Sequence, residues 1–245
     1  MWTKQQVEHH KEAARLLIKI KDLTFEHIQK NKSISEYEVQ QFIVEKFHTY
    51  NLKTDKYPPI VAFNKNSATP EFYPKKVSDR LYNNTFILVD LWARLNVENA
   101  PFADITWVAF YGKNVPPEIQ KVFDIVTGVR DDVLLYIKNQ LKDDRIPTGR
   151  DAALVAFEKI KNTGHEKNIL HELGHSIGIN QDHGPKPDWL YQKNRSKLHK
   201  NLAYTIEPGI YIADKFGVRS EIDFYISEEN KVIVTTDVQK EIMRL

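Results

Sequence analysis

The chain has 245 residues, of which 41% are hydrophobic and 28% are charged, as in ordinary globular proteins. Its formal net charge of +2 gives no global attraction to nucleic acid or to an anionic membrane, so we expect neither as a partner. The absence of cysteine excludes disulfide bonds, thiolate zinc sites and a cysteine nucleophile, and it fits a reducing, cytoplasmic location.

The N-terminal half is predicted to form two helices followed by strands. Its first residues are polar, without a signal-peptide core, and no apolar run approaches the roughly 18 residues that a membrane span needs. Apolar positions recur with a helical rhythm over residues 7–28, and Ser35 with Glu38 forms a capping-box sequence before a second helix. Turn residues break the pattern over residues 51–59. Short β-branched and aromatic runs then predict strands at residues 60–63, 85–91 and 105–110.

The C-terminal half is predicted to form two more helices and then three strands. Pro116 and Pro117 suit a helix start, and apolar residues continue at helical spacing to Leu141. A shorter helix is expected over residues 150–160, a loop insertion over 184–200, and strands over 203–212, 218–226 and 232–236. No linker divides the chain, so we expect one α+β domain over residues 1–245.

A histidine cluster contains the sequence H-E-x-x-H between His171 and His175. On a helix this spacing would bind zinc, with Glu207 as a third ligand in one class of zinc peptidase. The metzincin pattern fails because Gln181 stands where its third histidine is required. The segment after His175 also alternates apolar and polar residues and carries two glycines, which favours a strand or a tight loop over a helix. Both histidines remain candidates for a site.

Four segments together resemble the metallopeptidases of the methionine aminopeptidase and creatinase type (family M24, the pita-bread fold). They are I-L-V-D ending at Asp90, A-D-I-T around Asp104, H-E-L-G-H-S-I-G from His171, and T-I-E-P-G-I-Y followed by G-V-R-S-E, ending at Glu221. The last segment is the most specific, and all four occur in the family's order. The resemblance implies a curved antiparallel sheet covered by helices.

The resemblance also implies two divalent metal ions bound by Asp90, Asp104, His175, Glu207 and Glu221. Asp104 and Glu221 would bridge the ions. Four carboxylates and one imidazole form an oxygen-rich site, for which Mn²⁺ is our first choice and Co²⁺, Fe²⁺ and Zn²⁺ are alternatives. Two such ions activate a shared water to attack a carbonyl carbon.

Further roles follow from the same resemblance. Glu207 would accept the proton of the attacking water, and His171 would steady the tetrahedral intermediate or move a proton. His183 matches a histidine that contacts the scissile peptide. Arg219 matches an arginine that forms an ion pair near the site. A hydrogen-bonded core histidine and a surface arginine are the alternative interpretations of His171 and Arg219.

Three features depart from the family pattern. The segment between Asp90 and Asp104 is longer than usual by about three residues, which could alter the rim of the pocket. Asp182 stands where the family has its second histidine, so either Asp182 or His183 could face the site. Glu71 (or the adjacent Phe72) replaces a substrate-binding histidine, and Glu71 could instead meet a substrate amine.

We therefore predict an enzyme that removes an N-terminal residue from peptides, preferably at Xaa-Pro bonds. A methionine aminopeptidase and a creatinase-like hydrolase acting on a small amide are alternatives. Some relatives lose the metal ligands and serve as binding modules, but all five ligand positions are intact here. A homodimer is compatible with the sequence.

Overall fold

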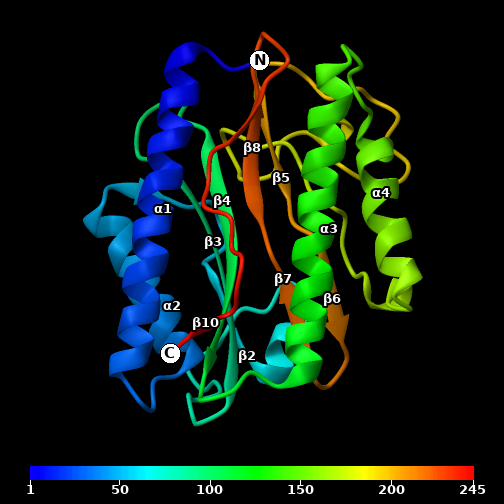
Figure 1. Cartoon of the computed structure of the whole chain (residues 1–245). Helices are drawn as coiled ribbons and strands as arrows, with labels where there is room; N and C mark the ends of the chain where they lie inside the picture. The colour runs from blue at the N-terminus through cyan, green and yellow to red at the C-terminus, as the bar shows by residue number, and fades with distance from the viewer.

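Helices flank the strands on two sides of the molecule (Figure 1). The computed structural model describes all 245 residues. Helices α1 (Lys4–Lys30) and α2 (Glu36–Thr49) lie on one side, and α3 (Pro117–Lys142) and α4 (Gly149–Asn162) on the other. Capping boxes begin α1, α2 and α4, and prolines begin α3, which confirms the predicted order of the helices. No helix is long and apolar enough to cross a bilayer.

A five-stranded sheet is built around the long hairpin of β3 (Thr85–Leu95) and β4 (Phe102–Tyr111). Strands β1 (Leu52–Lys53) and β2 (Ile60–Phe63) pair with β3 in the antiparallel sense. One edge of this antiparallel sheet carries a short parallel pairing, between β10 (Met243–Arg244) and β4. Parallel pairing is possible there because the chain reaches β4 by a long connection and not by a hairpin.

The remaining strands form a second, interrupted hairpin. The two runs predicted as continuous strands are each broken in two, giving β5 (Leu202–Ile206), β6 (Gly209–Ile212), β7 (Phe216–Arg219) and β8 (Ile222–Ile226), and β9 (Val232–Val234) follows on β8. Pro208 lies at the break, where its missing N–H cannot join the ladder. The register is the same on both sides, since Ile206 lies opposite Ile222 and Gly209 opposite Arg219.

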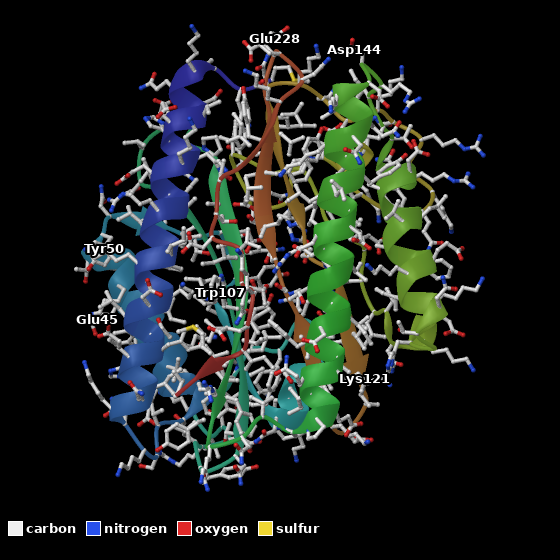
Figure 2. The ribbon with its side chains drawn as sticks, in the orientation of Figure 1. Glu45, Tyr50, Trp107, Lys121, Asp144 and Glu228 are labelled. Atoms are coloured by element: carbon white, nitrogen blue, oxygen red, sulfur yellow. The ribbon has the colours of Figure 1, made fainter.

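The hairpin β3–β4 separates two hydrophobic cores. Odd-numbered residues of β3, such as Ile87 and Val89, pack against α1 and α2, and even-numbered residues, such as Phe86 and Leu88, face the larger core with α3 and α4. On β4, Trp107 faces α1, where the Lys21 ammonium lies 3.7 Å from the centre of its ring (Figure 2). Because successive side chains point to opposite faces of the sheet, the same alternation determines which polar side chains of the hairpin point into the space between the two halves of the molecule.

Candidate metal centre

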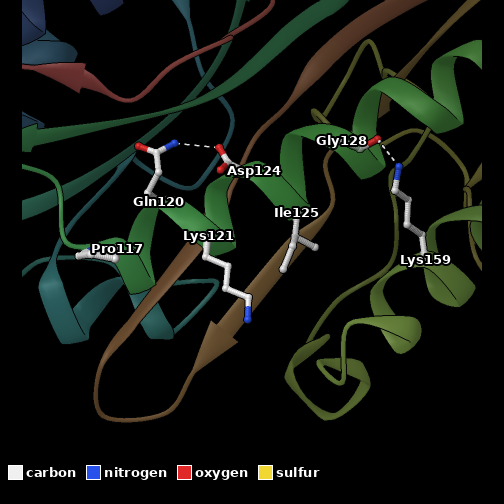
Figure 3. Close-up of a pocket in the computed structure, with 7 residues that line it drawn as sticks. All are labelled: Pro117, Gln120, Lys121, Asp124, Ile125, Gly128 and Lys159. Carbon is white, nitrogen blue, oxygen red and sulfur yellow. Dashed lines mark hydrogen bonds between the residues drawn. The ribbon is translucent and has the colours of Figure 1, made fainter.

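The nine predicted site residues all line a single cavity of about 880 Å³ between the two hairpins. The five predicted metal ligands contribute to its wall, as do His171, His183, Glu71 and Arg219. A second hollow, between α3 and α4, is lined by Lys121, Asp124, Lys159 and their neighbours and shares no residue with this cavity (Figure 3). The predicted site residues therefore converge on one place.

The hairpin β3–β4 presents two carboxylates on its even-numbered face. Asp90 lies opposite Thr106, and Trp92 lies opposite Asp104. Because residues opposite each other and residues two apart share a face of a sheet, Asp90, Asp104 and Thr106 all point towards the second hairpin. Asp90 is 6% exposed and Asp104 is 5% exposed, so both carboxylates are held away from water.

The second hairpin supplies the other two carboxylates at its break. The shared register places Glu207 opposite Glu221, with no regular ladder between them. Arg219 and Asp223 stand two residues to either side of Glu221 on the same face. Thr106 donates a hydrogen bond of 2.8 Å to Glu221, and so ties the two hairpins together across the cavity.

His175 enters from a segment that is not helical, so the zinc-peptidase interpretation of H-E-x-x-H is excluded. The segment pairs through single bridges, Gly174 with Leu190 and Ser176 with Tyr204. A Cβ on Gly174 would lie 2.4 Å from the carbonyl oxygen of Thr205, so only glycine permits this close approach.

The tautomer of His175 is fixed by its surroundings. Its Nδ1 donates to the Ser176 carbonyl at 3.1 Å, which leaves the lone pair of Nε2 facing the carboxylates. Nε2 lies 3.3 Å from Glu207 Oε1 and 3.9 Å from Asp104 Oδ2. Burial lowers the pKa of His175 well below its usual value, so the imidazole is neutral and cannot form ion pairs with these acids. A cation between them is the arrangement that this geometry suits.

The carboxylates themselves fit divalent ions. One oxygen each of Asp90, Asp104 and Glu221 is buried without a hydrogen-bond partner. Burial, with repulsion among the acids, raises the pKa of Asp104 and Glu221 well above the usual range, and burial raises the pKa of Glu207 to about 8. Buried carboxylates without partners are costly, and a metal ion removes that cost. The donor set therefore fits oxygen-loving divalent ions such as Mn²⁺.

Arg219 is the cation that the structure itself supplies. Its side chain is 5% exposed and forms an ion pair with Asp90, which excludes the interpretation as a surface arginine. It also donates to Thr106 Oγ1 at 3.0 Å and to the Tyr211 hydroxyl at 3.0 Å. The three contacts hold Asp90 in one orientation.

His171 is tied into the same network. Its Nδ1 donates to the Glu172 carbonyl at 2.8 Å, so its Nε2 accepts from the Tyr211 hydroxyl at 2.8 Å. Burial and the charge of Arg219 lower the pKa of His171 to about 3, which keeps the ring neutral. Nδ1 lies 3.9 Å from Glu207 Oε2.

The structure also shows which of the alternative residues face the cavity. Glu71 lines the cavity from an exposed position, whereas Phe72 packs against the larger core. Both Asp182 and His183 line the cavity, but the Asp182 side chain is 4% exposed and that of His183 is 50% exposed. The centre of the His183 ring lies 3.9 Å from that of His175, with the two rings tilted by 38°.

Several contributors were missed from the sequence. Thr106 and Asp223 lie two residues beyond Asp104 and Glu221, so the period of a strand could have revealed them. Asp223 accepts a hydrogen bond of 2.9 Å from the Asp104 amide and so positions that residue. Tyr211 belongs to a motif that was noticed, yet its contacts with His171 and Arg219 depend on the fold.

Comparison with known proteins agrees with this geometry. Residues 8–228 match the model of metallopeptidase family M24. An uncharacterised peptidase of Staphylococcus epidermidis is 27% identical over 205 residues, which cover 83% of this chain and 54% of that protein. The chain spans only about half the length of this relative.

Solved structures agree as well. An X-Pro aminopeptidase from Thermotoga maritima superposes with a TM-score of 0.83 at 26% identity, over 100% of this chain and 64% of that one. An Xaa-Pro dipeptidase from Bacillus anthracis does so with a TM-score of 0.80 at 25% identity, over 99% of this chain and 63% of that one. The α+β pita-bread fold predicted from the sequence is thereby confirmed. Through its matched segments and its assembled carboxylates, the chain belongs to metallopeptidase family M24.

Proposed function

We propose that this protein is a dinuclear metal-dependent aminopeptidase that removes the N-terminal residue of peptides, with a preference for Xaa-Pro bonds. The observation that carries the proposal is that possible ligand atoms of Asp104, His175 and Glu221 lie within 4.8 Å of one another, and that both acids keep a buried oxygen without a hydrogen-bond partner. The names of the two superposed structures, an X-Pro aminopeptidase and an Xaa-Pro dipeptidase, support the substrate preference.

The five predicted ligands would bind the ions in two overlapping sets. Asp90 would complete one set and His175 with Glu207 the other, while Asp104 and Glu221 would be shared. Two divalent ions held in this way would supply an activated water and would polarise the scissile carbonyl. Mn²⁺ is the ion that we propose.

The chain's own residues orient these ligands. Arg219 holds Asp90, Thr106 holds Glu221, and the Thr205 hydroxyl lies 3.1 Å from Glu207 Oε1. Each ligand is thus fixed before metal or substrate arrives, which removes the cost of ordering it during the reaction.

Proton transfer falls to Glu207 and charge stabilisation to the pair of His171 and Tyr211. Burial raises the pKa of Glu207 to about 8. A positive charge nearby would lower this pKa towards neutral pH, which is where a general base works best. Neutral His171 presents no charge to the ground-state peptide. Its Nε2 orients the Tyr211 hydroxyl, which can redirect its proton to negative charge that develops on the carbonyl oxygen.

The outer part of the cavity would bind the substrate's N-terminus. Tyr57 and Tyr73 stack at 5.5 Å beside the carboxylates of Asp55 and Glu71, which line the same cavity. Aromatic faces with carboxylates nearby suit a short peptide that begins with a free ammonium group. Glu71 would then take the place of the family's histidine as a contact for that end of the substrate.

The test is product analysis by mass spectrometry. The protein, loaded with Mn²⁺, is incubated with Xaa-Pro, Met-Xaa and plain peptides, and we expect loss of one residue from the Xaa-Pro set. Glu207→Gln should abolish that cleavage, whereas Glu158→Gln, at an exposed position on α4, should leave it unchanged. Cleavage of Met-Xaa peptides alone would refute the specificity, and no cleavage by metal-loaded protein would refute the activity.

A further inference from the structure

Asp182 is an additional buried carboxylate at the metal centre that the five-ligand scheme does not use. The chain after His175 forms a tight loop, closed by a bridge between Ile177 and His183 and by a 2.6 Å hydrogen bond from the Gly178 amide to the Asp182 carbonyl. This loop turns Asp182 back beside His175. The residue is 3% exposed and lines the cavity.

Its distance from His175 is that of a fellow ligand. His175 Nε2 lies 3.6 Å from Asp182 Oδ2, between its 3.3 Å distance to Glu207 and its 3.9 Å distance to Asp104. Two donor atoms bound to one ion at about 2.1 Å in neighbouring positions lie about 3.0–3.4 Å apart. At 3.6 Å, Asp182 lies slightly outside this range, but nearer to it than Asp104, which is one of the predicted ligands.

The only side chain that shares a hydrogen bond with this carboxyl group is another acid, Asp104, and two ionised carboxylates cannot make that bond. Asp182 Oδ1 is buried without a hydrogen-bond partner, and the nearest basic nitrogen besides that of His175 is His183 Nε2, 3.6 Å from Oδ2. The guanidinium of Arg219 is engaged by Asp90. A buried carboxylate without a cationic partner is costly, and a metal ion would supply the missing positive charge.

We propose that Asp182 is a sixth protein ligand of the metal centre, on the ion that His175 binds. The inference rests on the proposed metal centre and deepens it. A further carboxylate makes the coordination shell harder and more negative, which favours Mn²⁺ over softer ions. It would also take up a coordination position that is otherwise open to water or substrate.

The experiment compares Mn²⁺ binding by wild type and Asp182→Asn in the full chain, by calorimetric titration after removal of metal. Asparagine keeps the shape of the side chain and can still donate a hydrogen bond to Asp104, but it loses the charge. We expect wild type to bind two ions and Asp182→Asn to bind one of them at least tenfold more weakly. Glu172→Gln removes an exposed carboxylate from the same cavity and should bind both ions as wild type does.

Thermal unfolding of the same proteins separates a ligand from a structural residue. If Asp182 is a ligand, the metal-free variant should unfold at the wild-type temperature or above, because one buried negative charge is gone, and Mn²⁺ should raise that temperature less than in wild type. Binding of both ions within twofold of wild type would overturn the inference and leave the metal centre intact. A lowered unfolding temperature with unchanged Mn²⁺ affinity would overturn it equally. Failure of wild type to bind Mn²⁺ would overturn the metal centre itself.

Discussion

Without metal, the protein should lose stability as the pH rises from 6.5 to 8, because its site concentrates buried acids. Burial raises the pKa of Glu207 to about 8, whereas the unfolded side chain ionises near pH 4.3. Over this interval the folded state therefore holds a proton that the unfolded state has lost. An acid with a raised pKa stabilises the fold below its unfolded pKa, and this contribution disappears as pH rises through the folded value.

The size of the effect follows from the proton difference. Each proton is worth about 1.4 kcal/mol per pH unit, so Glu207 alone should lower the free energy of unfolding by about 1.5 kcal/mol between pH 6.5 and 8. For a chain of this length, that corresponds to a fall in Tm of roughly 3–6 °C. The raised pKa values of Asp104, Asp182 and Glu221 act in the same direction. The lowered pKa values of His10, His171 and His175 act in the opposite direction, by about 0.4 kcal/mol each, because an unfolded histidine is half protonated at pH 6.5 and neutral at pH 8.

The assay is urea unfolding followed by circular dichroism at several pH values, in chelator and in excess Mn²⁺. In chelator the curve should decline above pH 6.5, and Glu207→Gln should flatten it. In Mn²⁺ the decline should vanish, because the bound ions replace the protons. A metal-free protein that is as stable at pH 8 as at pH 6.5 would refute the reasoning, since its buried acids would then have to be satisfied by something other than protons.

Three further predictions concern single residues. His10 is buried with a pKa lowered to about 4 by desolvation, so its own contribution to stability should fall by about 3 kcal/mol between pH 6.5 and 4, and urea unfolding should show that contribution as the difference in slope between wild type and His10→Gln. Gly174→Ala would place a Cβ 2.4 Å from the Thr205 carbonyl and displace the adjacent His175, the proposed histidine ligand, so calorimetry should show at least tenfold weaker Mn²⁺ binding. Arg219→Met should cost the metal-free protein about 3–5 kcal/mol in unfolding free energy, because Asp90 would be left buried without its partner, and an unchanged free energy would contradict the ion pair's role.

The helices and the central hairpin were predictable because local signals specify them. Capping boxes and the 3.6-residue period fix the helices, and the alternation of β3 and β4 fixes which side chains are buried. The four carboxylates were found because each lies in a recognisable short segment. Their convergence is not local, since Asp90 and Glu221 meet only when the two hairpins pack together.

Features that depend on close packing escaped the sequence. Pro208 breaks a strand that composition alone favours, and β10 pairs with β4 only because the C-terminal segment returns to that edge. The choice between Asp182 and His183 as the buried side chain depends on the tight loop closed at Gly178. Neither residue type nor spacing reveals which way such a loop turns.

The division of the carboxylates between two hairpins has a consequence for folding kinetics. Asp90 with Asp104, and Glu207 with Glu221, are each brought together by a local hairpin that can form early. The complete site exists only after the two hairpins dock across a long stretch of intervening chain, a step of high contact order. Bound ions would therefore stabilise contacts made after the rate-limiting barrier. Mn²⁺ should slow the unfolding rate of this protein and leave its folding rate almost unchanged.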